Sequence, residues 1–70
     1  MSSDEAAEDS VRQRSNPIDF QAYELIGAAD VPGGQVARLL GISKASAYKA
    51  KSRIAAEIRA EFLRMNEEAR

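Results

Sequence analysis

The chain lacks the two residue types that most often carry chemistry at protein sites: its 70 residues include no cysteine and no histidine. Without cysteine there is no disulfide to staple a small fold and no thiolate nucleophile. Without histidine the chain also lacks the commonest metal ligand and the commonest general base. A catalytic site would have to be built from carboxylates, lysines and tyrosines on a very small scaffold. We therefore expect a protein that is not an enzyme and that uses no metal or cofactor.

The sequence also lacks a long apolar run. No stretch approaches the roughly 18 apolar residues that a membrane-spanning helix needs. The first ten residues, MSSDEAAEDS, are acidic, whereas a signal peptide begins with basic residues and continues with an apolar segment. We therefore expect a soluble cytoplasmic protein without a membrane partner. Its length allows at most one domain, with a modest core.

The net charge of −1 conceals a strong segregation of charges along the chain. Residues 1–10 contain four acids and no cation. Residues 35–59 contain six cations and a single acid, Glu57, so this segment has a net charge of +5. Such an asymmetry favours a polyanion as the partner of the basic half, although a solvated helix face can carry the same charges.

Residues 1–15 are mostly polar or small and show no hydrophobic periodicity. A segment of this composition buries too little apolar surface to offset the entropy lost when the chain is ordered. We therefore predict a disordered acidic tail over residues 1–15, followed by a helical domain over residues 16–66. Such a tail either only solubilises the chain or lies over the basic surface and weakens non-specific binding.

Three helices are predicted in this domain, and each is marked by a start or stop signal. Asn16 can cap the first helix, and Pro17 suits the first helical position because its missing N–H is not needed there. Gly41 ends the second helix, since glycine readily adopts the left-handed conformation found there. Ser43 caps the third helix. The predicted helices span about 17–28, 33–40 and 44–66.

The predicted third helix has two contrasting faces when its residues are placed about 100° apart. The apolar side is formed by Ala47, Ile54, Ile58 and Met65. The opposite side, termed the acid-free face, is formed by Ala45, Lys49, Ser52, Arg53 and Ala56. Lys49 and Arg53 lie one turn apart with no acid between them, an arrangement that costs a few tenths of a kcal/mol. We therefore expect this pair to bind an anion from outside the helix.

The turn between the second and third helices is that of a helix-turn-helix motif. Ala37 is small enough to let the two helices cross closely, and Ile42 in the Gly-Ile-Ser turn can plug the seam between them. In this motif the second helix enters the major groove of DNA. Helical hairpins without a DNA partner share parts of the pattern, so the spacing alone leaves both possibilities open. We predict an all-α, three-helix domain without a wing, with a long C-terminal recognition helix.

The segment VARLLGISKASAYKAKSRI, residues 36–54, is similar to the helix-turn-helix of region four of bacterial sigma factors, and closest to the extracytoplasmic-function group. It follows that group's approximate pattern V-A-x-x-L-G-I-S-x-x-x-V-Y-x-x-K-S-R. The preceding FQAYEL resembles the helix that packs under the motif, and the resemblance covers about residues 17–60. Ala47 stands where the family usually has Val, and Gln35 replaces a common acid. The given residues do not include the family's promoter-melting domain and leave hardly any room for the first helix of region four, so the chain is either a fragment of a longer sigma factor or a free-standing sigma-like module.

The resemblance implies a function in transcription initiation. The family's domain reads the upstream promoter element through the major groove, and its opposite side docks on the flap of the RNA polymerase β subunit. Carried over by position, Lys44, Ala45, Lys49 and Arg53 face DNA, and Lys51 and Ser52 match the family's Lys-Ser pair. Arg38 is a candidate for a backbone phosphate contact, and Tyr48 either contacts DNA or packs its ring in the core. The predicted DNA-binding residues are Arg38, Ser43, Lys44, Ala45, Tyr48, Lys49, Ser52 and Arg53.

The end of the predicted third helix leaves the oligomeric state open. Ile54, Ile58, Phe62 and Met65 extend beyond what a three-helix core can cover, so they either pair with a second copy in a homodimer or fray. Three functions are compatible with the sequence. They are a sigma-like promoter-binding domain, a free-standing helix-turn-helix regulator that dimerises, and a module that binds RNA polymerase or an anti-sigma protein without DNA.

Overall fold

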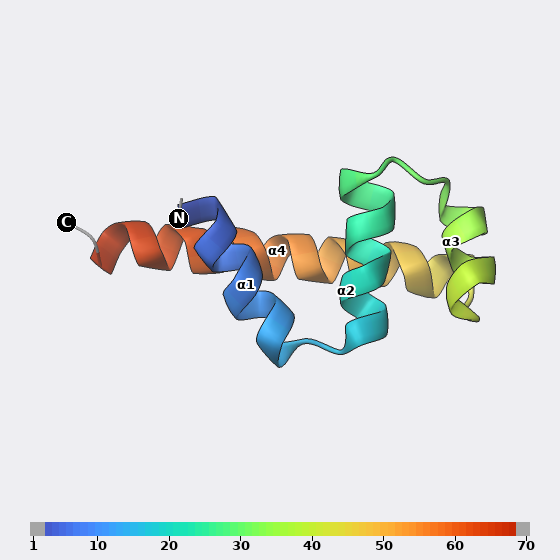
Figure 1. Cartoon of the computed structure of the whole chain (residues 1–70), viewed down its shortest axis with the longest axis horizontal. Helices are drawn as coiled ribbons and strands as arrows, with labels where there is room; N and C mark the ends of the chain where they lie inside the picture. Colours follow the sequence, from blue (N-terminus) through green and yellow to red (C-terminus); the bar gives the residue numbers. More distant parts are fainter. Residues whose placement is uncertain (1–2, 69–70) are drawn as a thin grey trace.

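The long C-terminal helix, α4 (Lys44–Glu68), forms the axis against which the other helices pack (Figure 1). The computed structural model describes residues 3–68, in which every regular element is helical and no strand occurs. The other elements are α1 (Ser3–Arg14), α2 (Pro17–Tyr23), the π-helical segment η1 (Glu24–Ala28) and α3 (Gly33–Leu40). α3 lies beside the start of α4, α2 crosses it further along, and α1 crosses its C-terminal half (Figure 1). The prediction of an all-α fold is confirmed.

The start and stop signals act as the sequence predicts. The side chain of Asn16 accepts a hydrogen bond from the N–H of Ile18 at 2.9 Å, which caps α2. Gly41 adopts the left-handed conformation, with φ of 69°, at the end of α3. The hydroxyl of Ser43 accepts from the N–H of Ser46 at 3.0 Å, which caps α4. The predicted first helix corresponds to α2 continued by η1, and the other two correspond to α3 and α4.

The predicted disordered tail is wrong for the residues described, because α1 occupies Ser3–Arg14 and packs against the rest of the fold. Ala7 and Val11, one turn apart, are both fully buried. Apart from Ala6 the remainder of the segment is polar, so two side chains provide nearly all of its periodic signal. The order of α1 therefore depends on a tertiary surface that its own composition does not reveal. As a result, residue 16 does not separate a tail from a domain.

The core consists of two clusters that meet along α4. One cluster joins α2, α3 and α4, and Ile42, the predicted plug of the turn, packs against it. Its buried members are Ala22, Val36, Ala47 and Ala50. The second cluster joins α1, α2 and α4 through Val11, Phe20 and Ile54, and Ile58 packs against it. α1 thus covers part of the apolar side of α4 within the same chain.

Polar contacts add to the attachment of α1. Arg12 lies over the ring of Phe20, with 5.0 Å between the guanidinium carbon and the ring centroid, and also pairs with Glu24 at 3.7 Å. Burial, followed by the negative charges of the nearby Glu8 and Glu24, raises the pKa of the Tyr23 hydroxyl. These contacts link α1 to α2 and to the start of η1.

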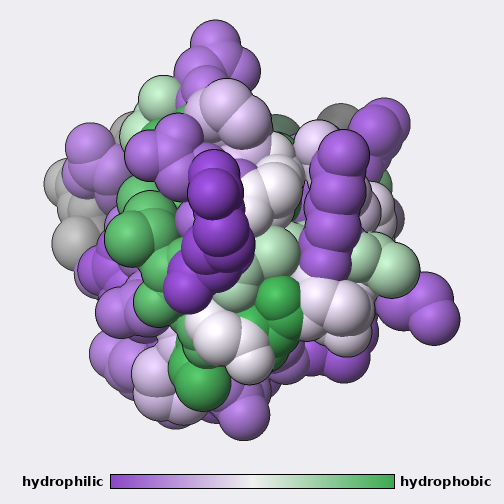
Figure 2. Space-filling view, turned by 90° about the vertical axis from the view of Figure 1, so that its right-hand side faces the viewer, coloured by the Kyte–Doolittle hydropathy of each residue, from purple (hydrophilic) through white to green (hydrophobic). Residues whose placement is uncertain are grey.

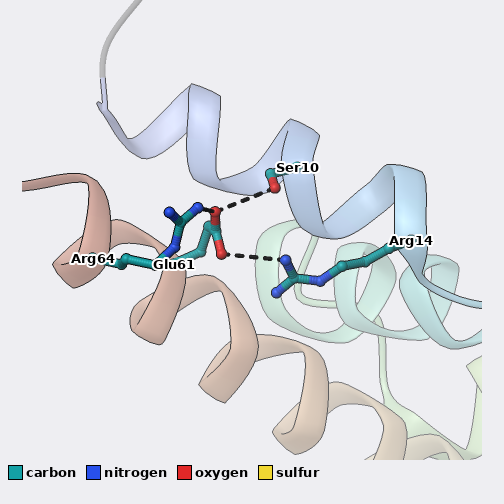
Figure 3. A network of polar contacts seen from close by, with 4 residues as sticks. All are labelled: Ser10, Arg14, Glu61 and Arg64. Carbon is teal, nitrogen blue, oxygen red and sulfur yellow. Dashed lines mark hydrogen bonds and ion pairs between the residues drawn. The ribbon is translucent and has the colours of Figure 1, made fainter. Parts of the chain in front are cut away.

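Glu61, an acid near the end of α4, holds the other side of α1 (Figure 3). Its side chain is only 5% exposed. Nη1 of Arg14 donates to Oε2 at 3.2 Å, Ser10 donates to Oε1 at 3.4 Å, and Arg64 also pairs with Oε1 (Figure 3). The hydrogen bond from Arg64 lowers the pKa of Glu61 from its ordinary value of 4.5, burial opposes this, and Arg14 lowers it further. The ionised carboxylate therefore holds α1 and α4 together more strongly than the protonated carboxyl does.

Replacing Glu61 by glutamine should make the stability of the chain less dependent on pH. A carboxylate with a lowered pKa contributes stability above its unfolded value, and this contribution is lost as the pH falls through the lowered folded value. Urea unfolding should therefore show wild type to be more stable than Glu61→Gln above pH 4.5, with the difference shrinking at more acid pH. Glu67→Gln is the matched control, since Glu67 is exposed on the same helix. A difference between wild type and Glu61→Gln that persists at all pH values would contradict this role.

Candidate nucleic-acid interface

The first three turns of α4 present the acid-free face to solvent. Ala45, Lys49, Ser52, Arg53 and Ala56 are all exposed, as the helical periodicity predicts. Lys44 at the first position of the helix is exposed as well. The residues between them on the buried side, Ala47, Ala50 and Ile54, are at most 3% exposed. The packing of α2 and α3 onto α4 therefore fixes which side of the helix a partner can reach.

The two cations of this face differ in their surroundings. Lys49 forms no ion pair within the part of the chain that the structure describes. Arg53 is paired, because its Nη2 contacts Oδ2 of Asp19 in the first turn of α2. The expectation that both cations lack a partner within the chain is therefore wrong for Arg53. The crossing of α2 over α4 brings together residues 34 positions apart.

Two shallow hollows lie on either side of this ion pair. One, of about 210 Å³, is lined by Asp19, Ser46, Lys49, Ala50 and Arg53. The other, of about 240 Å³, is lined by Arg14, Ser15, Asn16, Asp19, Arg53, Ile54 and Glu57. Both are open to solvent and small, so neither encloses a ligand. The first hollow brings Lys49, Arg53 and Asp19 onto one surface.

Tyr48 has a packing role that the sequence left open. Its ring lies against Gly33 at the start of α3, where a Cβ would approach ring carbon Cε2 to 2.4 Å. Only glycine can accept the ring at that distance, and Gly33 is buried. The Tyr48 side chain remains 44% exposed. Tyr48 therefore packs between α3 and α4 and still presents part of its surface to solvent.

Arg38 and Ser43, the remaining predicted contact residues, lie at the end of the molecule formed by α3 and the start of α4. Arg38 is exposed on the last turn of α3. The Ser43 hydroxyl accepts a hydrogen bond that caps α4 and donates one to the hydroxyl of Ser46 at 2.8 Å. Its hydrogen-bonding groups are therefore largely used within the chain. Leu39 is 64% exposed, and Figure 2 shows apolar surface between projecting hydrophilic side chains at this end.

Sequence reasoning missed one residue of this site, Asp19. Its position in the first turn of α2 gives it an ordinary reason to be acidic, because a negative charge there is favourable to the helix dipole. No local pattern links it to Arg53.

Comparisons of the chain with models of known protein families, with curated protein sequences and with solved structures find no match.

Proposed function

We propose that the chain is a DNA-binding helix-turn-helix module that places the first three turns of α4 in the major groove. The observation that carries this proposal is the exposed acid-free face, where long cations alternate with small residues. The major groove is about 12 Å wide and admits an α-helix. Ala45, Ser52 and Ala56 allow the helix backbone to approach the base edges closely. Lys44, Lys49 and Arg53 supply positive charge toward the phosphates.

The resemblance to sigma region four extends the proposal to promoter recognition with RNA polymerase as a second partner. A single module of this size covers only about 600–1,000 Å² of protein surface on DNA. Such an area supports weak binding by an isolated monomer. A tether to polymerase raises the effective local concentration at a promoter without further DNA contacts. The polymerase partnership rests on the resemblance, whereas DNA binding rests also on the exposed charged face.

Titration of a mixed-sequence DNA duplex with the isolated chain tests the DNA-binding proposal. Binding should be weak and should fall steeply between about 50 and 200 mM salt, because each phosphate contact contributes about 0.9 to the slope of log K against log salt. Fluorescence anisotropy of a labelled duplex reports the affinity at each salt concentration. Failure to bind any duplex at low salt would contradict DNA binding and favour a module that contacts only protein.

A free-standing dimeric regulator is the second candidate, and the C-terminal half of α4 favours it. Leu63 is 52% exposed there, and Phe62 and Met65 are half-buried even though α1 crosses this part of the helix. A second copy could cover these side chains. Sedimentation separates the two candidates: the sigma-like module is a monomer, whereas the regulator is a dimer that Phe62→Ser and Met65→Ser dissociate.

A further inference from the structure

The anion beside the acid-free face in the free protein is an internal carboxylate. Asp19 of α2 pairs with Arg53 of α4 and lines the same hollow as Lys49. The Asp19 side chain is 27% exposed and the Arg53 side chain 60% exposed. The acid is thus the more firmly held member of the pair, and the arginine is the member that can reorient toward a partner.

We propose that Asp19 competes with DNA for Arg53 and thereby weakens sequence-independent binding to duplex phosphates. This inference rests on the proposed function, since it concerns the same face of α4. In the free protein the Asp19 carboxylate occupies guanidinium donors that a phosphate oxygen would otherwise use. For Arg53 to contact a phosphate, its ion pair with Asp19 has to break.

The position of Asp19 makes the competition persist when DNA is bound. A carboxylate on the first turn of α2 cannot leave the interface unless the helix moves, because α2 is packed on α4 through Phe20 and Ala22. The freed carboxylate would face an incoming phosphate beside Lys49, and like charges repel. Asp19 therefore opposes non-specific binding by neutralising Arg53 and by repelling the DNA backbone.

Replacing Asp19 by asparagine should tighten binding to a mixed-sequence duplex. One additional phosphate contact increases the salt slope by about 0.9, which corresponds to a gain of about three- to tenfold in affinity near 0.15 M salt. The control is Glu67→Gln, which removes one negative charge from the exposed C-terminal part of α4, about 27 Å along the helix from Lys49. Circular dichroism should show that both variants retain the helix content of wild type.

A double-mutant comparison tests whether Asp19 acts through Arg53. The gain produced by Asp19→Asn should be smaller when Arg53 is already alanine, because only the repulsion between the carboxylate and the DNA backbone is then left to remove. The proposed competition is wrong if Asp19→Asn binds the duplex no more tightly than Glu67→Gln does, or if its gain in affinity is equally large without Arg53. Either result would leave the proposal of DNA binding intact. If none of these proteins binds the duplex, the proposed function is wrong and this inference is wrong with it.

Discussion

Replacing Ile54 by alanine is expected to unfold the chain or nearly so. Ile54 is 1% exposed and packs in the cluster with Val11 and Phe20, so it joins α1 and α2 to α4. Truncation of a buried isoleucine to alanine costs about 2–5 kcal/mol. At roughly 0.05–0.15 kcal/mol per residue, a chain of 70 residues has a total stability of only about 4–10 kcal/mol. Thermal and urea unfolding followed by circular dichroism measure the loss.

Ile18 provides the matched control for this substitution. It is the same residue type on a helix of the same fold, but 42% exposed. Ile18→Ala should change the free energy of unfolding by less than about 1 kcal/mol, since exposed substitutions usually have small effects. An Ile54→Ala protein that melts at the wild-type temperature would show that the second core cluster does not hold the helices together.

Replacing Lys49 by alanine is expected to produce the largest single loss of DNA affinity on the acid-free face. Lys49 is exposed and has no ion-pair partner among the side chains that the structure describes, so its charge is available to a phosphate. Loss of one phosphate contact lowers the salt slope by about 0.9 and weakens binding about three- to tenfold near 0.15 M salt. Arg53→Ala removes a charge that Asp19 already neutralises, but it also leaves the Asp19 carboxylate unpaired beside the DNA, so it should weaken binding to mixed-sequence DNA as well.

Arg59 provides the control for the loss of a positive charge. It is exposed on α4 but lies beyond the acid-free face, so Arg59→Ala should affect the affinity less than Lys49→Ala does. If Lys49→Ala and Arg59→Ala weaken binding equally, only the overall charge matters and the assignment of the groove-facing side is wrong. A contact from Lys49 to a base edge would instead cost about 1–3 kcal/mol, mainly on the preferred sequence.

The helix boundaries could be predicted because their signals are local. Asn16, Gly41 and Ser43 each satisfy or terminate backbone hydrogen bonds within a few residues, and the structure places all three at the expected helix ends. The periodicity of α4 likewise identified its exposed face. A helical wheel needs only the spacing of side chains along one element, so it succeeds without knowledge of the neighbours.

The predictions that the structure contradicts concern contacts between residues distant in sequence. α1 is ordered by burial of Ala7 and Val11 and by the bonds from Arg14 and Ser10 to Glu61, whose partners are separated by 47 and 51 positions. Asp19 and Arg53 are separated by 34 positions. Composition and periodicity describe one segment at a time, so they cannot reveal which acid will meet which arginine once α1 and α2 cross α4.

Mapping of amide chemical shifts tests most directly whether DNA contacts the acid-free face. The ¹⁵N-labelled chain is titrated with a mixed-sequence duplex at low salt, and the shift change of each amide is recorded. The largest changes should fall within residues 44–53 of α4 and near Arg38 at the end of α3, with little change in α1 or beyond residue 57. Changes concentrated in α1 or in the C-terminal half of α4, with residues 44–53 unaffected, would contradict such a contact.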